Sequence, residues 1–249
     1  EAGLGGEYDA TAIFPKLLTL VTPIDLDHEA FLGESIQEIA TTKLNAMQKN
    51  LIVSKQKFKE VQSIAQNIAS KKDAKVYTVE EFLESEGAEK IATIAKELSL
   101  ENYLQENLKL SISALKFLGV AYTPSDFKDA RLFGRLSKIA KNILIDVGHN
   151  PLAATSIAEA LSGRKFILIY NSYKDKDYKA ILQILKPIIW HVEILDVDEP
   201  RIELVEHLQS ALNELEIQFS HFKELKPEND YLVFGSFSVV ETFLREQYE

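Results

Sequence analysis

The sequence has no cysteine, one methionine and one tryptophan among its 249 residues. Without cysteine the chain can form neither a disulfide framework nor a reactive thiolate, which is compatible with a cytoplasmic protein. A single methionine argues against a methionine-rich binding groove. Long hydrophobic runs are also missing, because the apolar stretches 165–170 and 181–190 are shorter than the roughly 20 residues of a membrane-spanning helix. We therefore expect neither a membrane span nor a signal peptide.

Positive charge is scarce as well. The chain has 28 Lys and Arg against 38 Asp and Glu, which gives a formal net charge of −10. This balance argues against a surface that follows nucleic-acid phosphates and against a polybasic membrane anchor. Any anion that the protein binds must then be held by a few local groups. The hydrophobic fraction of 46% is sufficient for the buried core of one or two domains.

The hydrophobic pattern alternates between strands and helices, which is typical of parallel α/β sheets. In the first half, strands and helices are predicted in turn at 17–22, 36–47, 51–54, 58–69 and 75–79, with a helical stretch over 80–119. The pattern lapses over 121–131, so we place a linker there and divide the chain into domains 1–125 and 126–249. The second half predicts a Rossmann-like unit of four or five parallel strands, including 142–146, 165–170, 189–195 and 231–234.

Polar residues follow the predicted strands, where open α/β sheets bind their ligands. Asp146 and His149 precede Asn150-Pro151, a helix cap and first-turn pair whose following N–H groups would face an anion such as phosphate. The alternative is that Asn150-Pro151 only begins a helix and that Asp146 and His149 are solvated. The spacing alone does not decide between these interpretations.

Other candidate residues are weaker on their own. Asp27 and His28 follow the first strand and could ligate a divalent cation together with water and phosphate. Lys43 lies in an apolar to neutral helical stretch, where it either extends to solvent or has a lowered pKa. Arg135 could clamp phosphate oxygens or simply be solvated. Ser236 lies in a tight turn after the last strand, which is unspecific by itself.

Together these residues resemble a known family, the folylpolyglutamate synthases and dihydrofolate synthases of the Mur ligase superfamily. The resemblance extends along nearly the whole chain and rests on the order and spacing of its motifs. These are Glu1-Ala2-Gly3-Leu4-Gly5-Gly6 with Asp9-Ala10-Thr11, Asp27-His28 with Phe31-Leu32-Gly33, Lys43, Asn107, Gly134-Arg135-Leu136, 146–151, Asp175-Lys176-Asp177 and Gly235-Ser236.

The resemblance implies a metal site and an unusual lysine. Glu1 and His28 would ligate a Mg²⁺ ion that bridges the phosphates of ATP and the acyl phosphate. Lys43 would be a catalytic residue that corresponds to the family's carbamylated lysine. Addition of CO₂ turns a cation into an anion, which can position a metal ion or its bound water.

The resemblance also implies the nucleotide and glutamate contacts. Asn107, Arg135 and Asp146 match the family's contacts to ATP, and His149 would be a catalytic residue that faces the incoming glutamate and the reacting phosphate. Ser236 would lie at the same place. Some positions depart from the usual pattern: Glu7 stands where the family has Arg, and Phe133 where it has Pro. These departures concern substrate contacts rather than the type of reaction.

The implied reaction is ligation through a phosphorylated intermediate. ATP phosphorylates a folate or dihydropteroate carboxylate, and the amine of L-glutamate then attacks the acyl phosphate. Catalysis would rest on positioning and charge neutralisation. The expected partners are these small molecules only, with neither nucleic acid nor membrane, and the expected protein is a cytoplasmic monomer. Two alternatives stay open: another Mur-type ligase of cell-wall synthesis, and a nucleotide-binding module without catalysis.

The phosphate-binding loop of this family is missing from the sequence. No Gly-x-x-x-x-Gly-Lys-Ser/Thr occurs, although the family carries such a P-loop before the motif that begins at Glu1. We therefore expect the chain to be a fragment that does not turn over ATP by itself. Domain 1–125 would be part of a P-loop-type central domain, and domain 126–249 would be the Rossmann-like C-terminal domain of a Mur ligase.

Overall fold

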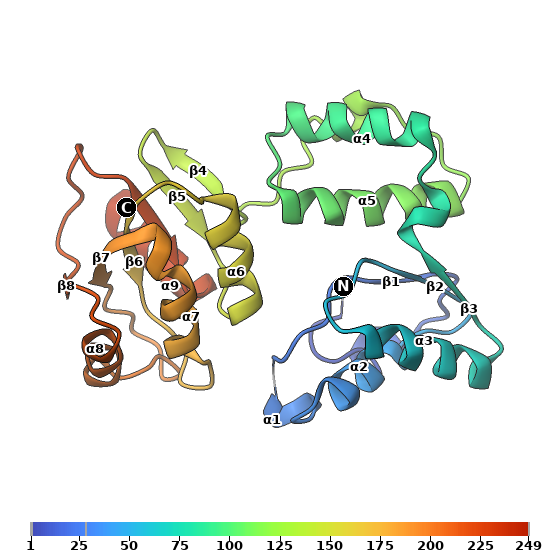
Figure 1. Ribbon diagram of the computed structural model, residues 1–249, viewed down its shortest axis with the longest axis horizontal. Helices are drawn as coiled ribbons and strands as arrows, with labels where there is room; N and C mark the ends of the chain where they lie inside the picture. Colours follow the sequence, from blue (N-terminus) through green and yellow to red (C-terminus); the bar gives the residue numbers. More distant parts are fainter. Residues whose placement is uncertain (1, 28, 249) are drawn as a thin grey trace. The chain divides into compact units, whose positions relative to one another are not determined.

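The computed structural model describes residues 2–27 and 29–248, and the chain divides into two compact units, Glu1–Arg131 and Leu132–Glu249 (Figure 1). The domain boundary predicted at 125/126 falls within the 3-10 helix η3 (Pro124–Phe127). The division comes later because Phe127 packs on the first unit, where its ring meets the ring of Tyr122 edge to face with centroids 5.9 Å apart. None of the described helices is long and apolar enough to cross a membrane.

The first unit is built on a parallel sheet. Over the described residues it has the strand order β1 (Thr19–Val21), β2 (Asn50–Val53) and β3 (Lys75–Thr78). Helices α2 (Ile36–Leu44) and α3 (Lys59–Lys72) connect the strands and share a core with Leu51 and Val53 of β2. Ile52 points to the opposite face, because successive strand residues alternate, and there it packs with Leu110. Both faces of the sheet are therefore covered, as expected of parallel strands.

A helical hairpin completes the first unit. Helices α4 (Ser85–Glu97) and α5 (Asn102–Phe117) pack through Ile94, Leu98 and Ile112. The helical prediction for 80–119 is confirmed, with two differences: the stretch begins as a 3-10 helix, η2 (Val79–Phe82), and it turns between the two α-helices. The turn contains Ser99, whose φ of 52° is left-handed and ends the first helix. Two further short helices, η1 (Ala10–Ile13) and α1 (Glu29–Leu32), lie before α2.

The second unit is a larger, mostly parallel sheet. Over the described residues its strand order is β4-β5-β9-β6-β7-β8, in which only β4 runs antiparallel to its neighbour. The strands are β4 (Ser137–Ala140), β5 (Ile143–Asp146), β6 (Phe166–Tyr170), β7 (Ile189–Ile194), β8 (Phe219–His221) and β9 (Tyr231–Phe234). The helices are α6 (Pro151–Ala160), α7 (Tyr178–Leu185), which continues into the 3-10 helix η4 (Lys186–Ile188), α8 (Val205–Glu214) and α9 (Phe237–Tyr248).

Helices cover both faces of this sheet. Val239 and Phe243 of α9 share a core with Ile169 and Val233, which lie on one face. Helices α6, α7 and α8 connect strands that advance in one direction across the sheet, so the right-handed crossover rule places them together on the other face. Strands β5, β9 and β6 are parallel neighbours, so their carboxyl ends lie side by side. At this point the helix after β5 and the helix after β9 lie on opposite faces of the sheet. This edge is where an open α/β sheet binds ligands.

Candidate functional site

Asp146 joins two loops at the carboxyl end of β5. Its side chain is 2% exposed, and both carboxylate oxygens accept backbone hydrogen bonds. Oδ1 accepts from the N–H of Gly148 at 2.7 Å, and Oδ2 accepts from the N–H of Leu136 at 2.9 Å. Since a buried carboxylate needs such partners, the geometry holds the loop after β5 and the turn that carries Arg135 in fixed positions.

The turn that carries Arg135 has an unusual backbone. Gly134 and Leu136 both have positive φ, 81° and 41°. The N–H of Gly134 donates to Ser137 Oγ at 3.0 Å, and its carbonyl accepts from the N–H of Val147 at 2.9 Å. A Cβ atom on Gly134 would lie 2.9 Å from a methyl carbon of Val147, so glycine is required there. The left-handed Leu136 is strained backbone directly beside the half-buried Arg135, and such strain concentrates at functional sites.

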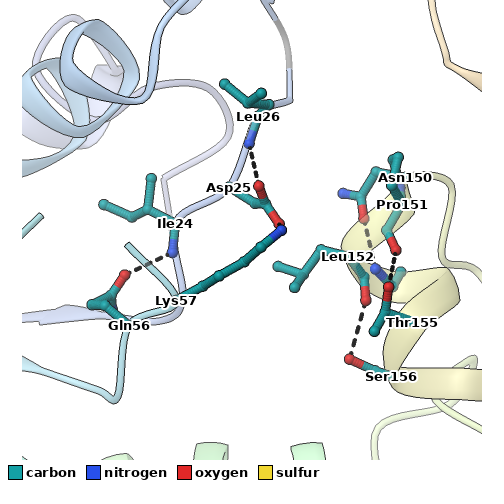
Figure 2. Close-up of polar contacts among 11 residues, drawn as sticks. Ile24, Asp25, Leu26, Gln56, Lys57, Asn150, Pro151, Leu152, Thr155 and Ser156 are labelled. Carbon is teal, nitrogen blue, oxygen red and sulfur yellow. Dashed lines mark hydrogen bonds and ion pairs between the residues drawn. The ribbon is translucent and has the colours of Figure 1, made fainter. Parts of the chain in front are cut away.

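Helix α6 begins where the sequence predicts, which confirms Asn150 as its cap and Pro151 as its first residue. Asn150 Oδ1 accepts from the N–H of Ala153 at 2.8 Å, and Pro151 is the first helical residue (Figure 2). His149 lies just before this cap and is half-buried. Its Nδ1 lies 3.1 Å from the carbonyl of Val147, so Nδ1 carries the proton and Nε2 is left as a hydrogen-bond acceptor in the neutral ring.

Gly235 and Ser236 form the connection from β9 to α9. Gly235 has a φ of 140°, and a Cβ atom there would lie 2.0 Å from the carbonyl oxygen of Asn171. Its N–H donates to the carbonyl of Gly148 at 3.1 Å, which ties this connection to the loop after β5. Ser236 is 0% exposed, and its Oγ accepts from the N–H of Val239 at 3.2 Å as a helix cap. The hydroxyl thus has a structural partner, and its predicted contact with a ligand stays a prediction.

Asn171 was not found from the sequence, although it holds the ends of two strands. It is buried, its Nδ2 donates to the carbonyl of Leu195 at 2.8 Å, and its Oδ1 accepts from the N–H of Ser172 at 2.7 Å. A hydrogen bond therefore joins the loops after β6 and β7, and a separate one joins the loops after β9 and β5. An asparagine directly after an apolar strand was the available signal, because a buried amide there must satisfy neighbouring backbone groups.

A second network ties the loops after β6 and β7 to α9. The Oγ of Ser238 donates to a carboxylate oxygen of Glu199 and lies 2.8 Å from the hydroxyl of Tyr173. The guanidinium of Arg201 lies over the Tyr173 ring, 4.5 Å from its centroid, and 3.5 Å from an oxygen of Asp175. These contacts keep the loops at this edge of the sheet in a defined arrangement. The motif Asp175-Lys176-Asp177 is part of it.

In the first unit, Asp9 shapes the glycine-rich segment. Its Oδ2 accepts from the N–H groups of Gly3 and Leu4 at 2.8 and 3.1 Å, and its Oδ1 accepts from the N–H and the hydroxyl of Thr11 at 2.8 and 2.7 Å. The hydrogen bonds from Thr11, with those from Leu4 and Gly3, hold the pKa of the Asp9 carboxyl well below its ordinary value. The spacing Asp-Ala-Thr, typical of a side chain that bonds the backbone two residues on, was the signal for this role.

The glycine-rich segment packs against the end of α2, where Lys43 lies. A Cβ atom on Gly6 would lie 3.2 Å from the carbonyl oxygen of Lys43. Glu7, which stands where the family has Arg, accepts a hydrogen bond from the side-chain amide of Asn45 at 2.8 Å. The carboxylate at this position is therefore bonded within the first unit. Lys43 is partly buried, and burial lowers its pKa, whereas the nearby carboxylate of Asp27 raises it by less. A greater fraction of Lys43 is therefore uncharged than in an exposed lysine.

The loop after β1 is held to the loop after β2. The N–H of Ile24 donates to Gln56 Oε1 at 2.9 Å, and Lys57 Nζ lies 3.1 Å from Asp25 Oδ2 (Figure 2). The N–H of Leu26 donates to the other oxygen of Asp25 at 2.9 Å. Asp25 thus serves as a local structural anchor, and an exposed ion pair of this kind adds little stability.

Three predicted site residues are not joined to these clusters. Glu1 and His28, the predicted metal ligands, lie outside the described residues. Asn107 lies on α5 with an exposed side chain, and its backbone carbonyl accepts from Ser111 Oγ at 3.0 Å. Among residues 2–27 and 29–248, no three His, Asp or Glu side chains are grouped as a metal site would require. The described part of the chain therefore does not test the predicted metal site.

Comparison with known proteins finds relatives of one kind. No family model matches the chain. The chain is 29% identical to the dihydrofolate synthase/folylpolyglutamate synthase of Haemophilus influenzae, over 98% of this chain and 66% of that protein. The crystal structure of Helicobacter pylori folylpolyglutamate synthetase matches with a TM-score of 0.71 and 36% identity, over 98% of this chain and 63% of that one.

A third match concerns the fold alone. The bifunctional folylpolyglutamate synthase/dihydrofolate synthase of Yersinia pestis, complexed with AMPPNP and a Mn ion, matches with a TM-score of 0.77 and 18% identity, over 100% of this chain and 66% of that one. These matches confirm the predicted α/β fold with parallel sheets. In each of the three comparisons the chain spans slightly less than two thirds of the relative's length. By its sequence and its structure, the chain is similar to the folylpolyglutamate synthases and dihydrofolate synthases.

Proposed function

We propose that the chain is part of an ATP-dependent ligase that joins L-glutamate to the carboxylate of a folate or a dihydropteroate through an acyl phosphate. The observation that carries this proposal is the arrangement at the end of β5. There Asp146 fixes the strained turn with Arg135 and the loop with His149 by hydrogen bonds from the chain itself. The names of the relatives supply the substrate class.

The second unit would bind phosphate and orient the reacting groups. The guanidinium of Arg135 offers a planar fork of donors for phosphate oxygens, and the N-terminus of α6 adds the positive end of its helix dipole. His149 presents Nε2 as an acceptor, which suits a contact with the ammonium or amine of glutamate. Asp146 would act on the nucleotide and also hold both loops in place. Charge neutralisation and positioning are the main requirements of such a transfer.

The first unit would supply the metal site and the modified lysine. Glu1 and His28 are the proposed ligands of Mg²⁺, which when bound neutralises phosphate charge. The uncharged amine of Lys43 would attack the carbon of CO₂ and lose one proton, which forms a carbamate with a new N–C bond. The burial that lowers the Lys43 pKa supports this step, because only the neutral amine reacts. Asn107 would contribute a contact to ATP.

We further propose that a segment with the P-loop precedes the glycine-rich motif in the full-length protein, and that the chain alone is inactive. The first unit would then be part of the central domain, and the second unit the C-terminal domain. Strand β1 supports this, because it is an edge of the described sheet and Leu20 in it is exposed, as are Phe14 and Leu17 just before it. The intact enzyme would be a cytoplasmic monomer.

The test measures ADP release by the full-length protein with ATP, L-glutamate and either dihydropteroate or a reduced folate. We expect release that depends on both glutamate and the pterin substrate, and none from the 249-residue chain. Release only with UDP-muramyl peptides would instead show a cell-wall ligase. Binding of ATP without release under any of these conditions would show a nucleotide-binding module, and either result would refute the proposal.

A further inference from the structure

Two aromatic rings are exposed at the carboxyl edge of the sheet in the second unit. Phe133 is 61% exposed and Phe237 is 64% exposed, whereas the rings of Phe166, Phe234 and Phe243 are buried in the core. Phe133 lies just before the turn that is bonded to the loop after β5, and Phe237 begins α9 after β9. An exposed aromatic ring on a fixed backbone is a typical ligand contact, because its flat face is free to pack.

The backbone beside Phe133 is held from three sides. Gly134 donates to Ser137 and accepts from Val147. The N–H of Leu136 donates to Asp146. A turn fixed in this way limits the positions that the Phe133 ring can take. The ring is therefore presented beside the turn at little further cost in conformational entropy, which favours a binding role.

Phe133 is also a close neighbour of the proposed phosphate contact. Only Gly134 separates it from Arg135, so the two Cα atoms are at most about 7 Å apart. A nucleotide carries an aromatic base as well as phosphates. A ligand whose phosphates contact Arg135 can therefore bring its base to the same turn. Phe237 has the same exposure, but the residue before it is the buried Ser236, whose hydroxyl accepts from the N–H of Val239, whereas Arg135 is half-buried.

We infer that Phe133 is the base-stacking residue of the nucleotide site, with its ring packed against the purine of ATP. This inference rests on the proposed function, because it takes Arg135 as a phosphate contact. Stacking accepts any flat base but favours the larger purines. Phe133 would therefore contribute to nucleotide affinity and to the preference for purine over pyrimidine triphosphates, without taking part in the chemical step.

The test uses the full-length protein and two probes, ATP and inorganic tripolyphosphate, which has the charge but no base. Phe133→Ala should weaken ATP binding on the order of tenfold, the usual effect of losing one stacked ring, and leave tripolyphosphate binding unchanged. Phe133→Trp should retain ATP affinity because it keeps an aromatic face. Phe237→Ala, a ring of equal exposure, is the matched control and should alter neither.

The outcomes separate the inference from the proposed function. Equal loss of both probes in Phe133→Ala would show that the turn has collapsed around Arg135 and would overturn stacking. Unchanged ATP affinity in Phe133→Ala, with normal binding by the unsubstituted protein, would also overturn stacking but leave the ligase proposal intact. A full-length protein that binds no ATP at all would refute the proposed function, and the stacking inference would fail with it.

Discussion

Replacing Gly235 by alanine probes the contact between β9 and the loop after β6. The new Cβ atom would lie 2.0 Å from the carbonyl oxygen of Asn171, a backbone atom that cannot rotate away. The backbone must shift, and overpacking of this kind costs about 1–3 kcal/mol. The φ of 140° adds about 1–3 kcal/mol for a residue with a side chain. We expect Gly235→Ala to lower the free energy of unfolding of the second unit by about 2–6 kcal/mol.

Gly163→Ala is the matched control. Gly163 lies in the same unit with a φ of 81°, and a Cβ atom there would meet nothing within 4 Å. Its substitution should carry only the conformational cost of about 1 kcal/mol. Urea denaturation followed by tryptophan fluorescence measures both, because Trp190 is the single tryptophan and lies in the second unit. Equal losses in the two variants would refute the steric reasoning.

Three further predictions concern single side chains. Lys43→Ala in the full-length protein should abolish ligase activity, with partial rescue by small carboxylates; activity equal to that of the unsubstituted enzyme would exclude a carbamate role. Hydrogen bonds from Thr11, Leu4 and Gly3 lower the pKa of Asp9 in the folded state. The stabilisation that the ionised Asp9 carboxylate gives to the fold is therefore complete above about pH 4 and is lost as the pH falls further. The stability difference between the unsubstituted chain and Asp9→Asn, from denaturation at several pH values, should therefore shrink below pH 4, and a constant difference would contradict this. Burial raises the pKa of Glu193, whose Oε2 has no hydrogen-bond partner in the described structure, so its ionised form destabilises the fold. Glu193→Gln should raise the urea midpoint at pH 7 but not at pH 4, and a gain at both would point to another cause.

The larger elements of the fold were predictable because their signals are local. The residues at Asn150 and Pro151 predict the start of a helix, and the apolar run 166–170 predicts a buried strand. Each of these signals lies within a few consecutive residues. Strands β4 and β8 were not predicted. Both are short and lie at the sheet edges, and in β8 two of the three residues are exposed, so no apolar alternation marks them.

The candidate site was predictable in its residue types more than in its contacts. Asp146 was chosen for its place after a strand, but its bond to Leu136 joins residues ten positions apart and depends on the fold of the turn. Ser236 was chosen for its hydroxyl, and only the structure shows that this group is buried as a helix cap. The burial that lowers the Lys43 pKa arises from packing, which an apolar neighbourhood in sequence only suggests.

The strand order of the second unit has a consequence for how the protein is made. β9 follows the other strands of its sheet in the chain, yet it pairs with β5 on one side and β6 on the other. Until residues 231–234 have left the ribosome, the pair β4-β5 and the group β6-β7-β8 have no strand to join them. The apolar edges of β5 and β6 then stay open during synthesis, so nascent chains that stall before residue 231 should depend on chaperones to avoid aggregation.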